Sequence, residues 1–125
     1  MATVTIAVRR IYEDLKGPKS EYRVLVDRLW PRGVSKRSVR IDEWAKDLAP
    51  STDLRRWYGH DPVRFAEFSH RYRDELREAV AVEAATAVLV EASSRSTLVL
   101  LTATKDVDHS GAVVLAKHLG RRRRR

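Results

Sequence analysis

The sequence predicts a small α/β domain with a mainly parallel sheet of about three to four strands and flanking helices. Two apolar runs support this prediction. Residues 97–103 (TLVLLTA) are almost continuously apolar and bounded by polar residues, as in strands that are buried on both faces. The run that starts at Tyr22 places apolar side chains on both faces of a second strand and ends in Asp27 and Arg28. Apolar residues at helical spacing between these runs indicate the helices that a parallel sheet requires.

Length and composition indicate one domain, which we place at residues 1–120. The chain has 125 residues, of which 43% are hydrophobic, enough for one ordinary core. It has no cysteine, which excludes disulfide scaffolds, thiol nucleophiles and thiolate metal sites. Charges come too early for a signal peptide, and no stretch has the apolar length of a membrane span, so we expect a cytoplasmic protein without membrane contact.

The positive charge is concentrated at the end of the chain. The formal net charge is +8, and the terminal run Arg121–Arg125 carries five of these charges, which leaves +3 for the rest. A block of like charges after Gly120 predicts a disordered tail at residues 121–125. Such a tail gives weak, non-specific binding to nucleic acid that depends on salt.

The first half of the chain begins with a strand and contains one ambiguous segment. Alternating residues from Val4 to about Arg9 or Ile11 predict a strand, and a turn-rich link follows over residues 13–21. After the strand that ends at Asp27 and Arg28, Pro31 and Gly33 turn the chain away from the sheet. Residues 40–48 fit either a short helix or an extended segment that packs Trp44 inward.

Helical signals dominate the middle of the chain. Ser51 suits the N-cap of a short helix that Gly59 ends, and Asp61 with Pro62 begins the next helix. An apolar stripe predicts that this second helix continues to about Ala81; its members are Phe65, Phe68, Tyr72, Leu76, Ala79 and Val80. Another helix is predicted over residues 82–93.

A last helix is expected after the strand at residues 97–103. Asp108 is a plausible N-cap for it, and Gly120 is the expected end. Residues at helical spacing between them predict the face that packs on the core; they are Ala112, Leu115, Ala116 and Leu119.

Polar side chains follow both predicted strands at their carboxyl ends. Parallel strands of one sheet end at the same edge, where ligands collect, so the two groups should meet. Arginine offers a planar fork that matches the oxygens of a phosphate or carboxylate. The predicted ligand-binding residues are Asp27, Arg28, Trp30, Arg32, Gly33 and Lys105, and the candidates for an acid or base are His109, His60 and Asp106. An equally plausible interpretation is an internal salt bridge from Asp27 to Arg28 or Arg32 that stabilises the turn.

Three hypotheses for function remain open on these grounds. The first is a site for an anionic small molecule, with or without catalysis; the second is a nucleic-acid-associated protein. The third is a structural or partner-binding domain without a ligand. Phosphate-loop, dinucleotide-binding and nucleophile-elbow motifs are absent, and no pair of histidines has metal-binding spacing, so we predict no cofactor and no metal.

Three segments together carry a resemblance to a known family. They are DRLWPRGVSK at residues 27–36, DLAPSTDLRRWYGHDP at residues 47–62 and TKDVDHSGAVVL at residues 104–115. The chain resembles the YeaO-like family of small bacterial proteins of unknown function, over nearly its whole length apart from the arginine tail. The resemblance implies an arginine-rich turn after one strand and an acidic, histidine-bearing turn after another. It implies no particular activity.

Overall fold

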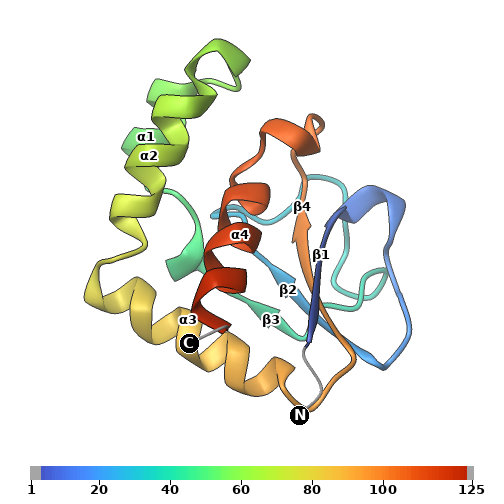
Figure 1. The fold of residues 1–125 in the computed structure, drawn as a ribbon. Helices are drawn as coiled ribbons and strands as arrows, with labels where there is room; N and C mark the ends of the chain where they lie inside the picture. Colours follow the sequence, from blue (N-terminus) through green and yellow to red (C-terminus); the bar gives the residue numbers. More distant parts are fainter. Residues whose placement is uncertain (1–3, 124–125) are drawn as a thin grey trace.

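A computed structural model describes residues 4–123, which form one four-stranded parallel sheet (Figure 1). The strand order is β1-β4-β2-β3, and β4 lies between β1 and β2. The strands are β1 (Thr5–Arg10), β2 (Glu21–Leu25), β3 (Glu43–Trp44) and β4 (Thr97–Thr102). The predicted fold class is therefore confirmed, and the ambiguous segment around Trp44 is extended.

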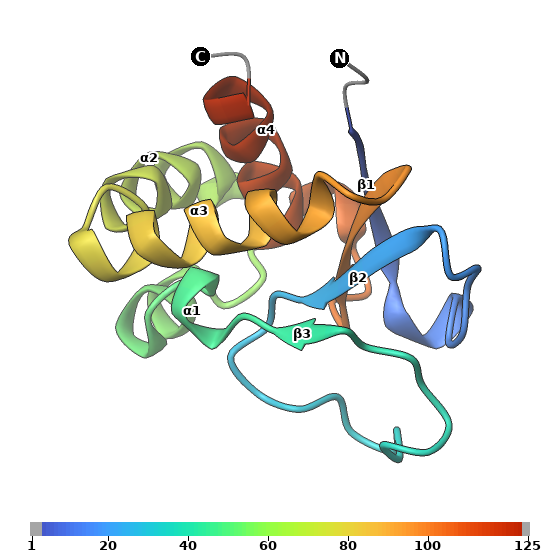
Figure 2. The same ribbon diagram turned by 90° about the horizontal axis from the view of Figure 1, so that it is seen from below.

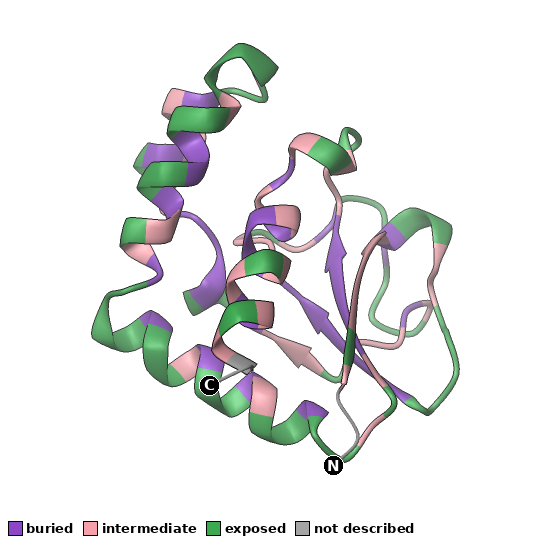
Figure 3. Ribbon diagram, viewed as in Figure 1, coloured by how far each residue is buried: buried purple, intermediate pink, exposed green. Residues whose placement is uncertain are grey.

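The helices lie on one side of the sheet, where the last two pack against its strands, and loops cover the other face (Figure 2). The helices are α1 (Thr52–Tyr58), α2 (Phe65–Glu75), α3 (Ala79–Ala92) and α4 (Gly111–Arg123). Val24, Leu98 and Leu100 pack against the helices. Leu25 and Leu101 point to the opposite face, where they pack with apolar residues of the loops after β1 and β2. Buried residues therefore occupy both faces of the two central strands (Figure 3).

Local capping explains the start and end of α1. The Ser51 side chain accepts a hydrogen bond from the Leu54 N–H, and Gly59 adopts φ 57°, the left-handed conformation that ends many helices. Asp61 accepts a hydrogen bond from the Val63 N–H, and Pro62 follows as the first residue of a 3-10 turn that leads into α2. The signals at Ser51 and Gly59 are as the sequence predicts, whereas Asp61 and Pro62 begin the 3-10 turn and α2 itself begins at Phe65.

The prediction that the second helix continues to Ala81 is wrong, because the chain bends after Glu75. The break lies between α2, which ends at Glu75, and α3, which begins at Ala79. Leu76 is buried, but Val80, the last member of the predicted stripe, is 61% exposed. The bend lets α2 pack against α1 and α4 while α3 packs against β2, two positions that one straight helix cannot occupy.

Both predicted ends of the last helix also need correction. Asp108 lies within a 3-10 turn (Val107–His109), and the hydroxyl of Ser110 accepts the hydrogen bond from the Val113 N–H at 3.4 Å. Gly120 does not end α4, which continues to Arg123. Residues 121–123 of the predicted tail therefore belong to α4, and residues 124–125 lie outside the described part of the chain.

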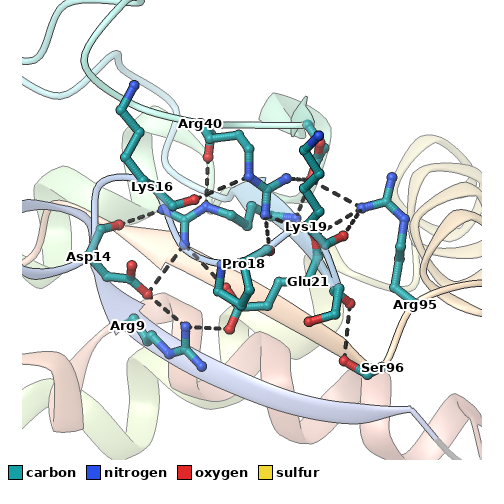
Figure 4. Close-up of polar contacts among 12 residues, drawn as sticks. Arg9, Asp14, Lys16, Pro18, Lys19, Glu21, Arg40, Arg95 and Ser96 are labelled. Carbon is teal, nitrogen blue, oxygen red and sulfur yellow. Dashed lines mark hydrogen bonds and ion pairs between the residues drawn. The ribbon is translucent and has the colours of Figure 1, made fainter.

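A network of ion pairs holds the loop between β1 and β2 against these two strands (Figure 4). Arg23 on β2 is fully buried beneath this loop, and its guanidinium lies 3.3 Å from Asp14 and 3.4 Å from Glu21. Arg9 donates to the same two carboxylates at 2.7 Å each. Arg40 adds hydrogen bonds to backbone carbonyls of the loop. The charges of Arg9 and Arg23 thus balance those of Asp14 and Glu21, and Glu21 begins β2, at the opposite end of this strand from the polar turn that begins at Asp27.

No helix within residues 4–123 is both long enough and apolar enough to cross a membrane.

Candidate functional site

A cavity of about 570 Å3 lies at the carboxyl ends of β2 and β4. The turn after β2 (residues 26–32) and the segment after β4 (residues 103–106) both line it. They meet because β2 and β4 pair in parallel, with Leu25 opposite Leu101. The first residues of α4 complete one side of the cavity. The sheet topology therefore brings together the two polar turns that the sequence places far apart.

Asp27 lines the cavity and is anchored to the end of β4. Its carboxylate accepts hydrogen bonds from the Thr102 hydroxyl and from the Ala103 N–H, each at 2.7 Å. Burial raises the pKa of Asp27 above its ordinary value, although these two hydrogen bonds act in the opposite direction. Within residues 4–123 no ion pair joins Asp27 to Arg28 or Arg32, so the predicted internal salt bridge is wrong.

Arg28 and Arg32 differ in how they are held. The half-buried guanidinium of Arg28 donates to the backbone oxygens of Pro50 at 3.2 Å and Ala49 at 3.4 Å. Arg32 is exposed, and its backbone oxygen accepts a hydrogen bond from Tyr12 at 2.8 Å. Both arginines line the cavity. Arg28 therefore joins the turn after β2 to the segment before α1, whereas the side chain of Arg32 makes no hydrogen bond or ion pair within residues 4–123.

The other two predicted residues of this turn have different surroundings. Trp30 lines the cavity, donates from its indole nitrogen to the Val34 oxygen at 2.6 Å, and packs edge-on against Trp44. Trp30 is only half-buried, which leaves part of its ring at the cavity wall. Gly33 has φ 78°, and it is not among the residues that line the cavity. Its part in the site is limited to the shape of the turn.

The turn after β4 contributes Lys105 and Asp106 to the cavity but not His109. Lys105 and Asp106 are exposed and line it. The His109 Nδ1 atom lies 2.8 Å from a carboxylate oxygen of Asp106, and its ring packs edge-on against Phe65. His109 ends the 3-10 turn before Ser110 instead of lying in the first turn of α4. It therefore orients Asp106 from outside the cavity.

Helix α1 supplies residues that the sequence did not assign to the site. Arg55, Arg56 and Tyr58 line the cavity, and so does the predicted candidate His60, which follows the helix with φ 57°, a left-handed conformation that is uncommon outside glycine. The Tyr58 hydroxyl donates to the His109 oxygen at 2.6 Å, which fixes α1 to the turn after β4. The two arginines are conspicuous in the sequence, but no local pattern there places α1 over the end of β2.

The lining residues carry more positive than negative charge. Five cationic side chains line the cavity with only two carboxylates, those of Asp27 and Asp106; the cations are Arg28, Arg32, Arg55, Arg56 and Lys105. None of the five takes part in an ion pair within the described chain. Over the same residues, no three His, Asp or Glu side chains come together as a group that could hold a metal ion.

Comparisons with known proteins give a family and several relatives. The model of a family described as "Inactive DUF488-N3 subclade" matches residues 5–125. An uncharacterised protein of Mycobacterium tuberculosis (strain H37Rv), Rv3073c, is 46% identical over 117 residues, which cover 94% of this chain and 95% of the relative. The uncharacterised protein YeaO of Escherichia coli (strain K12) is 35% identical over 116 residues, which cover 93% of this chain and 97% of YeaO. No solved structure gives a significant match.

Proposed function

The chain belongs to the inactive DUF488-N3 subclade, with YeaO among its relatives, and on this premise we propose that its cavity binds an anionic small molecule without converting it. The ligand bears a phosphate or carboxylate group. The word "inactive" in the family description favours binding over catalysis. Of the two candidate histidines, His109, which pairs with Asp106, lies outside the cavity, which supports binding without conversion, and His60 is the one that lines it.

The observation that carries the proposal is the set of cations without counter-ions around one cavity. Asp27 is already hydrogen-bonded to Thr102 and Ala103, and Asp106 to His109. Neither carboxylate pairs with any of the five cations within residues 4–123. Guanidinium groups bind phosphate and carboxylate oxygens through two parallel hydrogen bonds, so a bound anion supplies the missing charge.

The start of α4 supports the same ligand chemistry. Gly111 and Ala112 line the cavity at the amino end of this helix of 13 residues. The first N–H groups of a helix have no partner within it, and the helix dipole favours negative charge at this end. The cavity therefore presents backbone donors as well as cationic side chains.

Phosphate titration at constant ionic strength tests the proposal. We expect phosphate to raise the melting temperature of the wild-type protein. The variant Arg32→Ala should bind phosphate about tenfold more weakly, because it lacks one charged hydrogen-bonding group. Arg37→Ala is the matched control, since Arg37 is an exposed arginine of the same loop that does not line the cavity.

The unliganded stability of Arg32→Ala separates a ligand site from a structural network. The Arg32 side chain is exposed and has no hydrogen-bonding partner in the described chain, so this variant should unfold at nearly the wild-type temperature. The melting temperature of the wild-type protein should be higher in phosphate, or in a carboxylate such as citrate, than in chloride at the same ionic strength. The proposal is contradicted if neither anion raises it.

A further inference from the structure

The lining of the cavity changes in character from its rim to its floor. Exposed polar side chains form the rim, among them Arg32, Arg56 and Lys105. The floor is buried and largely apolar; it includes Val26, Tyr58, Phe68 and Ala112. A ligand that occupies the cavity therefore holds its anionic group at the rim and its body against the floor.

Asp27 is the exception in this inner region, because it places a carboxylate among apolar side chains. An ionised carboxylate has about four acceptor positions, two on each oxygen. In the described chain Oδ1 accepts from the Thr102 hydroxyl and Oδ2 accepts from the Ala103 N–H. The Trp44 indole donates to the backbone oxygen of Asp27 and not to its carboxylate. Each carboxylate oxygen thus retains one acceptor position.

From this arrangement we infer that the ligand carries, besides its phosphate or carboxylate, an adjacent pair of hydrogen-bond donors that bind the two oxygens of Asp27. Vicinal hydroxyls of a sugar and neighbouring N–H groups of a heterocycle share this chemistry. The inference rests on the proposed function, since it assigns the body of the same ligand. A half-buried carboxylate with free acceptor positions selects a donor strongly, because a ligand without one leaves these positions unpaired.

The dimensions and walls of the cavity agree with a ligand of this kind. Its volume of about 570 Å3 lies within the range of small-molecule sites. Tyr58 and Phe68 stack at 4.2 Å between ring centroids and form one apolar wall, which suits a ring-shaped body. The cationic rim binds the anionic group of the ligand, and the carboxylate of Asp27 binds its hydrogen-bond donors. The two ends of the ligand are therefore held by different parts of the cavity.

Three phosphate esters test the inference in the wild-type protein. Phenyl phosphate offers no donor on its ring, ribose 5-phosphate offers adjacent hydroxyls, and 2′-deoxyguanosine 5′-monophosphate offers adjacent N–H groups on guanine. We expect at least one of the last two to bind about tenfold or more tightly than phenyl phosphate in calorimetric titration. Whichever of them binds more tightly identifies the source of the donors.

A pair of charge-matched variants then assigns the selectivity to Asp27. Asp27→Asn should abolish the preference over phenyl phosphate while inorganic phosphate still binds. Asp106→Asn removes the same charge from the rim and should retain the preference. An asparagine at residue 27 still accepts from the Ala103 N–H and donates to the Thr102 hydroxyl, so we expect Asp27→Asn to fold. The wild-type comparison remains decisive if it does not.

The outcomes separate this inference from the function on which it rests. Binding of inorganic phosphate together with equal affinity for all three esters overturns the inference and leaves the anion site intact. A preference that survives in Asp27→Asn also overturns the inference. Failure of inorganic phosphate and of all three esters to bind overturns the proposed function and the inference with it.

Discussion

Gly17 shows how closely the buried Arg23 is fitted to the loop above it. This glycine has φ 63°, and a Cβ atom placed on it would lie 2.5 Å from Arg23 Nη1 and 2.5 Å from Glu21 Oε1. Two separate constraints therefore act at one residue, a left-handed backbone and a lack of space. Gly33 shares the first constraint with φ 78° but has no atom within 4 Å of the same position.

The two glycines make a matched pair of substitutions. We expect Gly33→Ala to cost about 1 kcal/mol of unfolding free energy from backbone strain alone. Gly17→Ala should cost about 3 kcal/mol, because it also displaces a buried ion pair. Urea denaturation of both variants measures the difference, and equal losses would show that the space around Gly17 can adjust.

Asp14, a carboxylate of the same network, makes the stability of the fold depend on pH. Burial raises its pKa, but the hydrogen bond from Arg9 and the charge of Arg23 outweigh burial, so the pKa in the folded state is lower than the ordinary value of 3.8. A carboxylate with a lowered pKa stabilises the fold above its unfolded pKa, and this stabilisation is lost as the pH falls through the folded value.

Stability measured across acid pH tests this link. We expect the wild-type melting temperature to fall below about pH 4, and Asp14→Asn to be less stable at neutral pH with a shallower fall in acid. Asp108→Asn serves as the control, since Asp108 is exposed and forms no ion pair within the described chain. Parallel acid profiles for wild type and Asp14→Asn would contradict this assignment.

Among the elements, two strands and one helix were predicted correctly from local signals. Strands β2 and β4 follow from their apolar runs, and α1 follows from Ser51 and Gly59. The break between α2 and α3 has no such signal, because residues 76–78 contain neither glycine nor proline and the helical period continues across them. Strand β3 has only two residues, and its pairing with β2 creates it. Tertiary packing therefore determines where the α2–α3 break falls and where β3 forms.

Helix α4 is the element where local signals were most misleading, and it gives a direct prediction. Gly120 lies inside the helix with nothing within 4 Å of a Cβ position, and Arg122 donates to the Val82 oxygen and to the Thr86 hydroxyl of α3. Gly120→Ala should therefore stabilise the fold by about 0.5–1 kcal/mol. A lower melting temperature would indicate that the helix ends at Gly120 after all.

At the scale of the whole molecule, the site was predictable only where strand ends determine it. The turn residues at Asp27 and Lys105 follow from two parallel strands, and the structure places both turns at one cavity. The arginines of α1 could not be predicted, because the contact between Arg28 and the Pro50 oxygen that locates α1 joins residues 22 positions apart. Strand order brings distant residues together, whereas helix placement depends on such individual contacts.

The terminal arginines affect the charge of the whole molecule and leave the cavity unchanged. Removal of Arg121–Arg125 lowers the formal net charge from +8 to +3. We expect the truncated protein to lose most of its binding to duplex DNA at low salt, since such binding scales with the number of phosphate contacts. Its affinity for inorganic phosphate should be unchanged. Retained DNA binding would indicate that the folded surface itself carries the nucleic-acid interaction.

The central position of β4 has a consequence for the order of events during synthesis. β1 pairs only with β4, and Thr5 lies opposite Thr97, so the first strand made must wait for nearly the whole chain before it finds its neighbour. β2 likewise gains its longer pairing only when residues 97–101 are available. Pairings between residues so far apart form slowly and expose unpaired strands meanwhile. On the ribosome, therefore, the sheet closes only after translation of the last strand, and until then the edges of β1 and β2 that face β4 stay unpaired.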